Sequence, residues 1–243
     1  PWGDRNAVLF DIPGRQFFLF GLRVAPEDII WLSGLLFIAA VALFFVTSLA
    51  GRVFCGYFCF QTLWSDLFLW IEEKVEGGRS RRLRLDKQPM SAQNAGKKGL
   101  KHLLWLAASL LTGITFTLYF ADTWTLWQQY LTFQAPVPAL VTAGLLTATT
   151  YTMAGWAREQ VCTYMCPYAR FQGAMFDKDT LIVAYDPNRG ERTQGRQPPK
   201  REESYEDRVA AGKGDCIDCG YCVKVCPTGI DIREGQQYQC ITC

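Results

Sequence analysis

The sequence predicts a mainly α-helical protein with several membrane-spanning helices and a small cysteine-rich segment near its C-terminal end. Three observations predict this class. Hydrophobic residues make up 49% of the 243 residues, yet the mean hydropathy is only +0.02, so apolar and polar residues are segregated. Three long runs carry no charged residue, and most of the ten cysteines lie after residue 215. We divide the chain into four parts: an N-terminal segment (1–28), a membrane domain (29–185), a polar linker (186–214) and the cysteine-rich segment (215–243).

The three uncharged runs cover residues 29–50, 103–121 and 139–157. At ~1.5 Å per residue, a helix of this length crosses the ~30 Å hydrocarbon core of a bilayer. Tryptophans lie at or near the ends of the runs, where interfacial aromatic residues are common. We therefore predict three transmembrane helices, and the tryptophans concerned are Trp31, Trp105, Trp124, Trp127 and Trp156.

The distribution of positive charge predicts the orientation of these spans. The net charge is only +2, but residues 74–101 are rich in lysine and arginine, whereas residues 122–138 contain neither. Positive loops stay in the cytoplasm, so we expect 74–101 inside, 122–138 outside and everything after Trp156 inside. Residues 1–28 are then periplasmic. Between two spans, the basic loop is expected to contact anionic lipid headgroups rather than nucleic acid.

Residues 53–71 follow the first span closely and are strongly apolar, but they include Gln61 and Asp66. A full crossing would need a very tight turn and would place Asp66 in hydrocarbon. An amphipathic helix at the cytoplasmic interface is therefore favoured over a fourth span.

The C-terminal segment contains Cys216-x-x-Cys219-x-x-Cys222-x-x-x-Cys226-Pro227. Three thiolates at this spacing bind one iron–sulfur cube, and the fourth, followed by proline, binds the second cube of two-cluster ferredoxins. A zinc site or a disulfide scaffold fits less well, because zinc sites separate two C-x-x-C units by a longer gap. A second motif begins at Cys240-x-x-Cys243 and would need two further cysteines. We therefore expect a fragment of a longer protein, with two 4Fe–4S clusters on a cytoplasmic, ferredoxin-like segment.

The remaining four cysteines form two C-x-Tyr-x-C pairs, each just after a predicted span. They are Cys55 with Cys59, and Cys162 with Cys166. Residues i and i+4 of a helix share a face, although Pro167 disfavours a helical Cys166 and is suited to begin a new helix. Three interpretations remain open: small buried residues, a redox-active dithiol, and thiolate ligands for Cu(I) or a further iron–sulfur centre.

Several motifs together resemble one family, the bacterial cytochrome c oxidase accessory proteins called CcoG, FixG or RdxA. They are Ala7-Val-Leu-Phe-Asp-Ile-Pro13, Gly51-Arg-Val-Phe-Cys-Gly-Tyr57, Arg158-Glu-Gln-Val-Cys-Thr-Tyr-Met-Cys-Pro-Tyr-Ala-Arg-Phe-Gln172, Met175-Phe-Asp-Lys-Asp-Thr-Leu-Ile-Val183 and Gly214-Asp-Cys-Ile-Asp-Cys219. The resemblance covers nearly the whole chain. One departure is Phe60, which stands where the family usually has a proline after its first cysteine pair.

The resemblance implies a protein of the bacterial inner membrane, with a further span and an immunoglobulin-like domain beyond residue 243. It implies a role in assembling the cbb-type cytochrome oxidase, through reduction of Cu(II) to Cu(I) for delivery to that oxidase. The implied partners are oxidase subunits, copper chaperones or copper transporters, and the implied activity is that of a cupric reductase.

Two other functions remain open as alternatives to copper reduction. The protein could be an electron-transfer subunit of a quinol-oxidising membrane complex, with Asp66 and the aromatic residues of 53–71 beside a quinone. It could also be a scaffold whose clusters only stabilise the fold. Copurification with copper or with quinone distinguishes copper reduction from the role in a quinol-oxidising complex.

Overall fold

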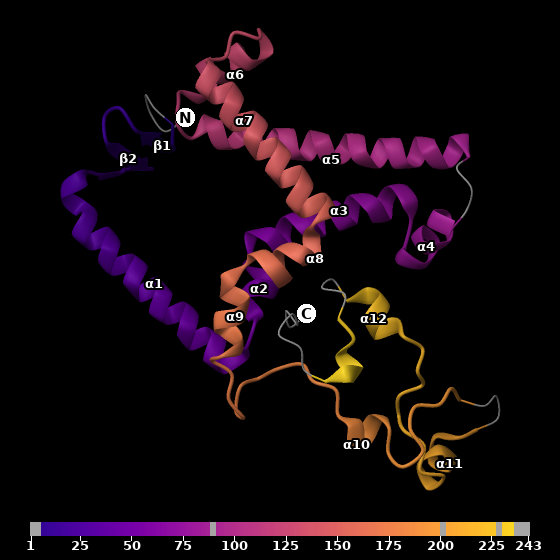
Figure 1. Cartoon of the computed structure of the whole chain (residues 1–243). Helices are drawn as coiled ribbons and strands as arrows, with labels where there is room; N and C mark the ends of the chain where they lie inside the picture. The colour runs from indigo at the N-terminus through magenta and orange to yellow at the C-terminus, as the bar shows by residue number, and fades with distance from the viewer. Residues whose placement is uncertain (1–5, 88–90, 200–202, 227–229, 236–243) are drawn as a thin grey trace. The chain divides into compact units, whose positions relative to one another are not determined.

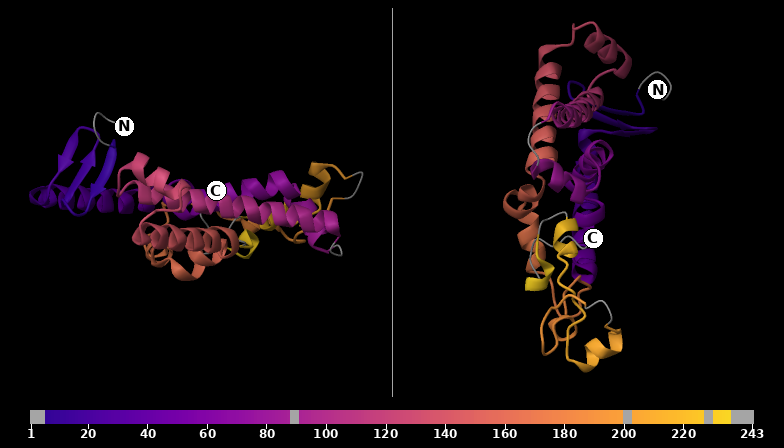
Figure 2. Two further views of the ribbon diagram at one scale, coloured as in Figure 1. Left: turned by 90° about the horizontal axis from the view of Figure 1, so that it is seen from above. Right: turned by 90° about the vertical axis from the view of Figure 1, so that its right-hand side faces the viewer.

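The computed structural model describes residues 6–87, 91–199, 203–226 and 230–235. Most of the described residues are helical, as Figures 1 and 2 show. The chain forms two compact units. The first unit contains the chain up to Leu43 together with residues 60–158, and the second contains residues 44–59 together with the chain from Glu159 onward.

The N-terminal segment forms a small antiparallel sheet that the sequence analysis did not predict. Its strands are β1 (Val8–Asp11), β2 (Gln16–Leu19) and β3 (Leu22–Val24), in that order across the sheet. Val8 pairs with Leu19, and Phe17 pairs with Val24. The three strands lie side by side in Figure 2. The backbone N–H of Phe10 donates to the carbonyl of Tyr119 at 2.8 Å, which ties the sheet to the chain just after α5.

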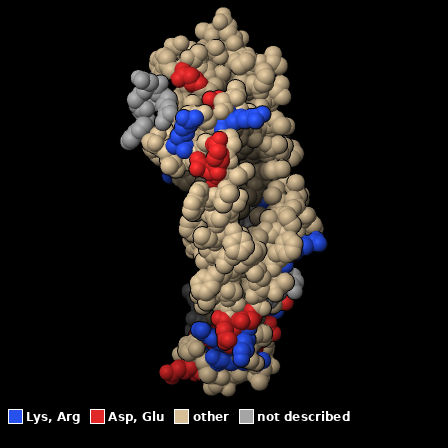
Figure 3. Space-filling model, turned by 90° about the vertical axis from the view of Figure 1, so that its left-hand side faces the viewer, with Lys and Arg blue, Asp and Glu red and all other residues tan. Residues whose placement is uncertain are grey.

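The first predicted span is confirmed as a helix, α1 (Ile29–Ala50), preceded by a short 3-10 turn over Pro26–Asp28. Three helical stretches are long and apolar enough to cross a membrane, and they cover Pro26–Ala50, Ala92–Leu118 and Val137–Trp156. Figure 3, in which α1 faces the viewer, shows an uncharged band over this helix. None of the most apolar part of α1 is buried inside the protein, as expected for side chains that face lipid. The chain is therefore a membrane protein.

The helices α5 (Ala92–Leu118) and α7 (Val137–Thr150) pack against each other in the first unit, and Figure 1 shows them crossing. The buried residues of α5 recur every fourth position and so lie on one face of the helix, and all but Trp105 are small. Gly113 is the closest approach, because an added Cβ would lie 2.5 Å from the carbonyl oxygen of Ala143. Small residues at helix interfaces are typical of membrane proteins. The buried residues are Trp105, Ser109, Gly113 and Thr117 on α5, with Ala143 and Thr147 on α7.

At one end of this bundle, aromatic rings and ion pairs form the core of the unit. The rings of Phe68 and Trp105 stack with centroids 5.3 Å apart. Glu72 is only 6% exposed and accepts two hydrogen bonds from Arg158, at 2.8 and 3.1 Å, and another from Arg82. Lys101 pairs with the buried Glu76 at 2.9 Å. His102, the only histidine, hydrogen-bonds the Tyr151 hydroxyl through Nδ1 at 2.9 Å.

The structure corrects the prediction of one amphipathic helix over residues 53–71. This segment forms two helices, α2 (Val53–Tyr57) and α3 (Phe60–Glu76), separated at Phe58 and Cys59. A tight turn does separate α1 from α2, and Gly51 adopts the left-handed conformation there, with φ of 60°. A Cβ at this position would lie 3.2 Å from the carbonyl of Leu181. Glycine is therefore suited to the turn by both backbone conformation and space.

The two predicted loops of the membrane domain are also largely helical. The basic stretch forms α4 (Arg79–Lys87) and the first turns of α5, so that α5 begins eleven residues before the predicted span. The stretch over residues 122–138 contains α6 (Thr123–Leu131). Its N-cap is Asp122, whose carboxylate accepts from the Thr125 backbone N–H at 2.9 Å. The second span was predicted to begin too late, because the residues before 103 are polar although they are already helical.

The segment predicted as a solvated linker is folded. It contains α10 (Pro187–Gly190) and α11 (Tyr205–Ala210), and an isolated β-bridge joins Arg192 to Lys213. Arg208 is 7% exposed and donates to the carbonyls of Gln197 and Gly214, both at 3.0 Å. Asp215 pairs with Arg189 and Arg192 at 2.8 and 2.9 Å. The charged residues that suggested solvation bind one another and the backbone.

The remaining helices lie around the cysteine motifs. A π-helix over Tyr151–Trp156 continues α7, and a second π-helix over Val161–Met165 follows the short α8 (Arg158–Gln160). Next come α9 (Pro167–Gly173) and, in the C-terminal segment, α12 (Tyr221–Val225) and a 3-10 turn over Ile232–Glu234. π-Helices are rare and occur often at functional sites.

Candidate functional site

The two repeated cysteine pairs have irregular backbone rather than one regular helix. Cys55 lies on α2, but Cys59 falls in the break before α3, so this pair does not share the face of one helix as predicted. Cys162 lies on the second π-helix. Cys166 is extended, with φ of −82° and ψ of 109°, and Pro167 begins α9 directly after it. The predicted effect of Pro167 on Cys166 is therefore confirmed.

All four of these cysteines belong to the second unit, where α2 and α9 are joined by several contacts. Arg52 is 2% exposed and donates through a terminal nitrogen to the Ala169 carbonyl at 2.5 Å. The Cys55 thiol donates to the side-chain carbonyl of Gln172 at 3.2 Å. The ring of Phe54 packs edge-on against Tyr168, with centroids 6.2 Å apart. These contacts bring the segments of the two pairs together, although they are more than a hundred residues apart in sequence.

The charges of the cysteines act on one another across the two pairs. Burial is the main cause that raises the pKa of the Cys55 thiol, to about 11, and Cys59, Cys166 and Cys162 raise it further. Burial also raises the pKa of Cys162, with further contributions from Cys59 and Cys166. Arg52 opposes both shifts, because its positive charge favours a thiolate. Ionisation of a cysteine in one pair therefore makes ionisation of the cysteines in the other pair less favourable.

The chemistry of this group fits a soft metal centre. Four thiols lie in the same unit as the buried Arg52, and none of the eight described cysteines forms a disulfide. Thiolates are the preferred ligands of Cu(I) and of iron–sulfur clusters. In the described part of the chain, however, no three His, Cys, Asp or Glu side chains lie close enough to hold a metal ion. The side chains would therefore have to adjust on binding, and ligation by these cysteines stays a prediction.

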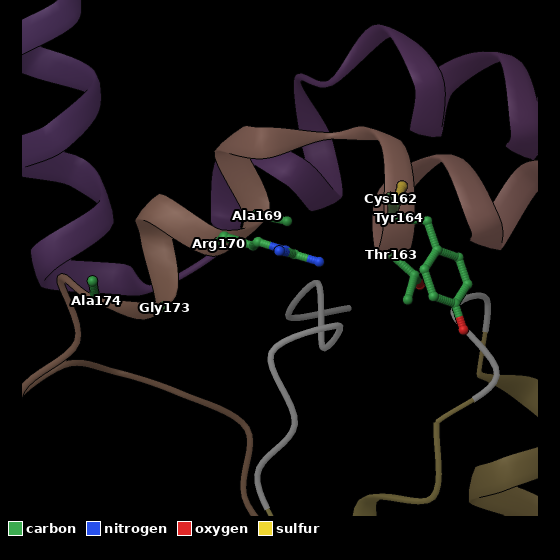
Figure 4. A pocket seen from close by; sticks show the side chains of 7 residues that line it. All are labelled: Cys162, Thr163, Tyr164, Ala169, Arg170, Gly173 and Ala174. Carbon is green, nitrogen blue, oxygen red and sulfur yellow. The ribbon is translucent and has the colours of Figure 1, made fainter.

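A cavity of about 510 Å³ opens beside Cys162. Figure 4 shows the Arg170 side chain extending from α9 along this cavity, with Thr163 and Tyr164 on the wall formed by the π-helix. Cys162 is therefore one of the residues that line this cavity. Its lining residues are Cys162, Thr163, Tyr164, Ala169, Arg170, Gly173 and Ala174.

The ferredoxin-like motif is described only in part. Cys216, Cys219, Cys222 and Cys226 lie along the loop before and through α12, whereas Cys240 and Cys243 lie outside the described residues. The predicted ligand pattern, in which Cys216, Cys219 and Cys222 bind one cluster and Cys226 binds the other with Cys240 and Cys243, therefore stays a prediction.

The loop between these cysteines is tightly curved. Asp218 and Gly220, which flank Cys219, both have positive φ, of 52° and 63°. Arg233 clamps the loop by pairing with Asp218 and Asp231. Cys219 and Cys222 are exposed, and Cys216 and Cys226 are partly buried. A curved loop of reduced, accessible cysteines fits an iron–sulfur cluster.

Sequence analysis missed two residues of the site, Arg52 and Gln172. Both side chains are polar and buried, and both belong to the segments that carry the cysteine pairs. Both lie inside the quoted family motifs, Gly51–Tyr57 and Arg158–Gln172, so their presence there was the available signal.

Comparison with known proteins supports the iron–sulfur assignment. Residues 157–243 match a family described as a 4Fe-4S dicluster domain, and residues 32–77 match a 4Fe-4S binding domain. The first match includes Cys162 and Cys166 as well as the ferredoxin-like motif, and the second includes Cys55 and Cys59. Both cysteine pairs therefore lie in segments that resemble 4Fe–4S proteins. No solved structure matches the chain.

Relatives match almost the entire chain. Protein RdxA of Cereibacter sphaeroides is 50% identical over 98% of this chain and 48% of its own length. Nitrogen fixation protein FixG of Rhizobium meliloti is 46% identical over 98% of this chain and 44% of its own length. Protein RdxB of C. sphaeroides is 45% identical over 97% of this chain and 48% of its own length. The chain thus spans about half the length of these relatives. The chain is therefore a homologue of RdxA, FixG and RdxB over nearly its whole length, with two segments that match 4Fe–4S domains.

Proposed function

We propose that this protein reduces Cu(II) to Cu(I) and supplies the reduced ion for assembly of a cbb-type cytochrome oxidase. The observation that carries the proposal is that Cys55, Cys59, Cys162 and Cys166 lie in one compact unit, where contacts of Arg52 and Cys55 join α2 to α9. Copper is the substrate, and these four thiols are its binding site, unless they hold a further iron–sulfur centre that passes the electron on. The activity is that of a cupric reductase.

The chemistry of the thiols suits the reduced ion better than the oxidised one. Thiolates select Cu(I) over Cu(II), so their affinity favours the product of the reduction. Each Cu(II) ion accepts one electron, and the 4Fe–4S clusters, when bound, supply single electrons at potentials of about −700 to +450 mV. Arg52 favours the thiolate forms that ligation requires. The residues of the site therefore bind and retain copper in its reduced state.

The location that fits this role is the bacterial inner membrane, with the ferredoxin-like segment in the cytoplasm. The lysines and arginines on α4 and the start of α5 that do not pair with Glu72 or Glu76 would contact anionic lipid headgroups. A reducing compartment keeps the thiols available as ligands. The proposed partners are subunits of the cbb-type oxidase and the chaperones or transporters that carry copper to it.

The experiment is a double substitution, Cys162→Ser with Cys166→Ser, in the full-length protein. We expect loss of copper reduction and of oxidase maturation, whereas the spectra of the ferredoxin clusters persist. The matched control is Met165→Leu, which changes an exposed sulfur residue between the two cysteines and should leave both readouts unchanged. Normal oxidase maturation in the double variant would contradict the proposal.

A second function is an electron-transfer subunit of a quinol-oxidising complex. Partial burial raises the pKa of Asp66 on α3, and a carboxyl group with a raised pKa is suited to accept a proton from a quinol. Copurification with quinone in place of copper, together with loss of quinol oxidation in Asp66→Asn, would favour this function over copper reduction.

A further inference from the structure

Gln172 has an unusual environment for an amide side chain. It lies on α9 and is completely buried, with an exposed fraction of 0%. Its carbonyl oxygen accepts from the Cys55 thiol at 3.2 Å. Its amide nitrogen, by contrast, is buried and has no hydrogen-bond partner among the residues that the structure describes. One half of the amide is therefore used and the other half is not.

A buried amide nitrogen without a partner is destabilising, and most such groups in folded proteins are hydrogen-bonded. Such an exception points to a state of the protein in which the donor is used. The sulfur of Cys55, which the same side chain already contacts, is a candidate acceptor. Cys55 Sγ is the donor in this structure because it carries its proton.

Binding of a soft metal reverses the hydrogen-bonding role of this sulfur. A ligated cysteine has lost its proton and can only accept. The two ends of an amide have almost the same shape. A half-turn about the Cγ–Cδ bond of Gln172 therefore replaces the oxygen with the N–H group and needs no extra space in the buried site.

We propose that Gln172 is a positioning residue for the four-cysteine site, and that its amide N–H donates to Cys55 Sγ when a soft metal is bound there. This inference rests on the metal site of the proposed function and assigns a new residue to it. The surrounding contacts support it. Arg52, which is buried, is held by the carbonyl of Ala169, three residues before Gln172 on the same helix. The helix α9 therefore supplies contacts to both Arg52 and Cys55.

The predicted effect is on metal affinity and on the electronic state of the sulfur. Residues that hydrogen-bond to metal ligands typically contribute about 10–100-fold to metal affinity. A donor to sulfur also stabilises its lone pairs, so removal of the donor shifts the thiolate-to-metal charge-transfer absorption to longer wavelength. A residue that only fills space in the core would affect neither quantity in the folded protein.

The test uses Cu(I) alone as the probe, added anaerobically to the full-length protein in detergent. Gln172→Leu keeps the volume and removes the donor. Gln172→Asn keeps the amide and moves it out of reach of Cys55, which covers the case in which the leucine variant does not fold. We expect both variants to bind Cu(I) about 10–100-fold more weakly in a chelator competition, with the shifted absorption. Gln128→Leu, an exposed position on α6 in the other unit, is the control and should match the wild type.

Two results would overturn the inference, and they separate it from the proposed function. In the first result, replacement of Cys162 and Cys166 abolishes Cu(I) binding, but the Gln172 variants keep the affinity and spectrum of the wild type. Gln172 then has no role, and the proposed copper site stands. If Cu(I) binding is indifferent to Cys162 and Cys166, the proposed copper site itself is wrong and the inference falls with it.

Discussion

At the residue scale, the cysteine pairs show how much chemistry can be recognised before a structure is known. Their identity and their repetition were visible in the sequence, because two C-x-Tyr-x-C pairs after two apolar runs are an uncommon pattern. Their surroundings were not. Arg52 and Gln172 are buried by contacts between segments more than a hundred residues apart, and no local pattern reports such burial.

The first residue-scale prediction concerns the ionisation of Cys55. Because only the thiolate is alkylated, and because burial and neighbouring cysteines raise the pKa to about 11, its reaction with iodoacetamide should be slow at neutral pH. The thiol is the dominant form below this pKa, so the rate should rise about tenfold per pH unit toward pH 11. Mass spectrometry of the metal-free protein after timed alkylation measures this. A rate that levels off near pH 8.5, as for an unperturbed cysteine, would contradict it.

The second residue-scale prediction concerns Glu72. Its carboxylate is buried and accepts from Arg158 and Arg82, so Glu72→Ala leaves two guanidinium groups without their partner. Breaking a buried ion pair from one side costs about 3–5 kcal/mol, and partial exposure of the arginines places the expected loss near the lower limit. Thermal unfolding in detergent measures the loss. The neighbouring Glu73 is exposed, and Glu73→Ala should change stability little.

At the scale of elements, the apolar helices were the most predictable part of the fold. The first predicted span coincides with α1, because the helix covers the same residues as a long uncharged run whose most apolar part is not buried in the protein. Prediction was poorer wherever polar residues pack on one another. The basic loop became α4 and the start of α5, and the predicted linker folds around Arg208 and Asp215. Ion pairs that stabilise these elements join residues whose proximity the sequence does not reveal.

The prediction at this scale tests the packing of α5 on α7. Gly113→Leu introduces a side chain where even a Cβ would lie 2.5 Å from the Ala143 carbonyl and 2.8 Å from the Thr147 hydroxyl. We expect a loss of about 1–3 kcal/mol, because the helices must separate or repack. Thermal unfolding in detergent is again the measurement. Gly144→Leu on α7 is the matched control, since nothing lies within 4 Å of its Cβ position. Equal stability of the two variants would contradict this packing.

At the scale of the whole molecule, the chain contains two repeats of the same local design, and their cysteine pairs lie in one compact unit. Each repeat consists of an apolar helix followed by a cysteine pair, and both pairs belong to the second unit although their helices belong wholly or partly to the first. The matches of residues 32–77 and 157–243 to 4Fe–4S domains fall on these two repeats. We therefore propose above all that Cys55, Cys59, Cys162 and Cys166 together bind a soft metal centre.

The most direct test is metal analysis of the anaerobically purified full-length protein, compared with a variant in which these four cysteines are replaced by serine. The two ferredoxin clusters account for about eight iron atoms per chain. The account predicts that the wild type binds copper or additional iron beyond this amount, and that the variant loses only that excess and keeps the electron paramagnetic resonance signals of the two clusters. Identical metal content in the two proteins, after both have been offered Cu(I) and iron, would contradict the claim.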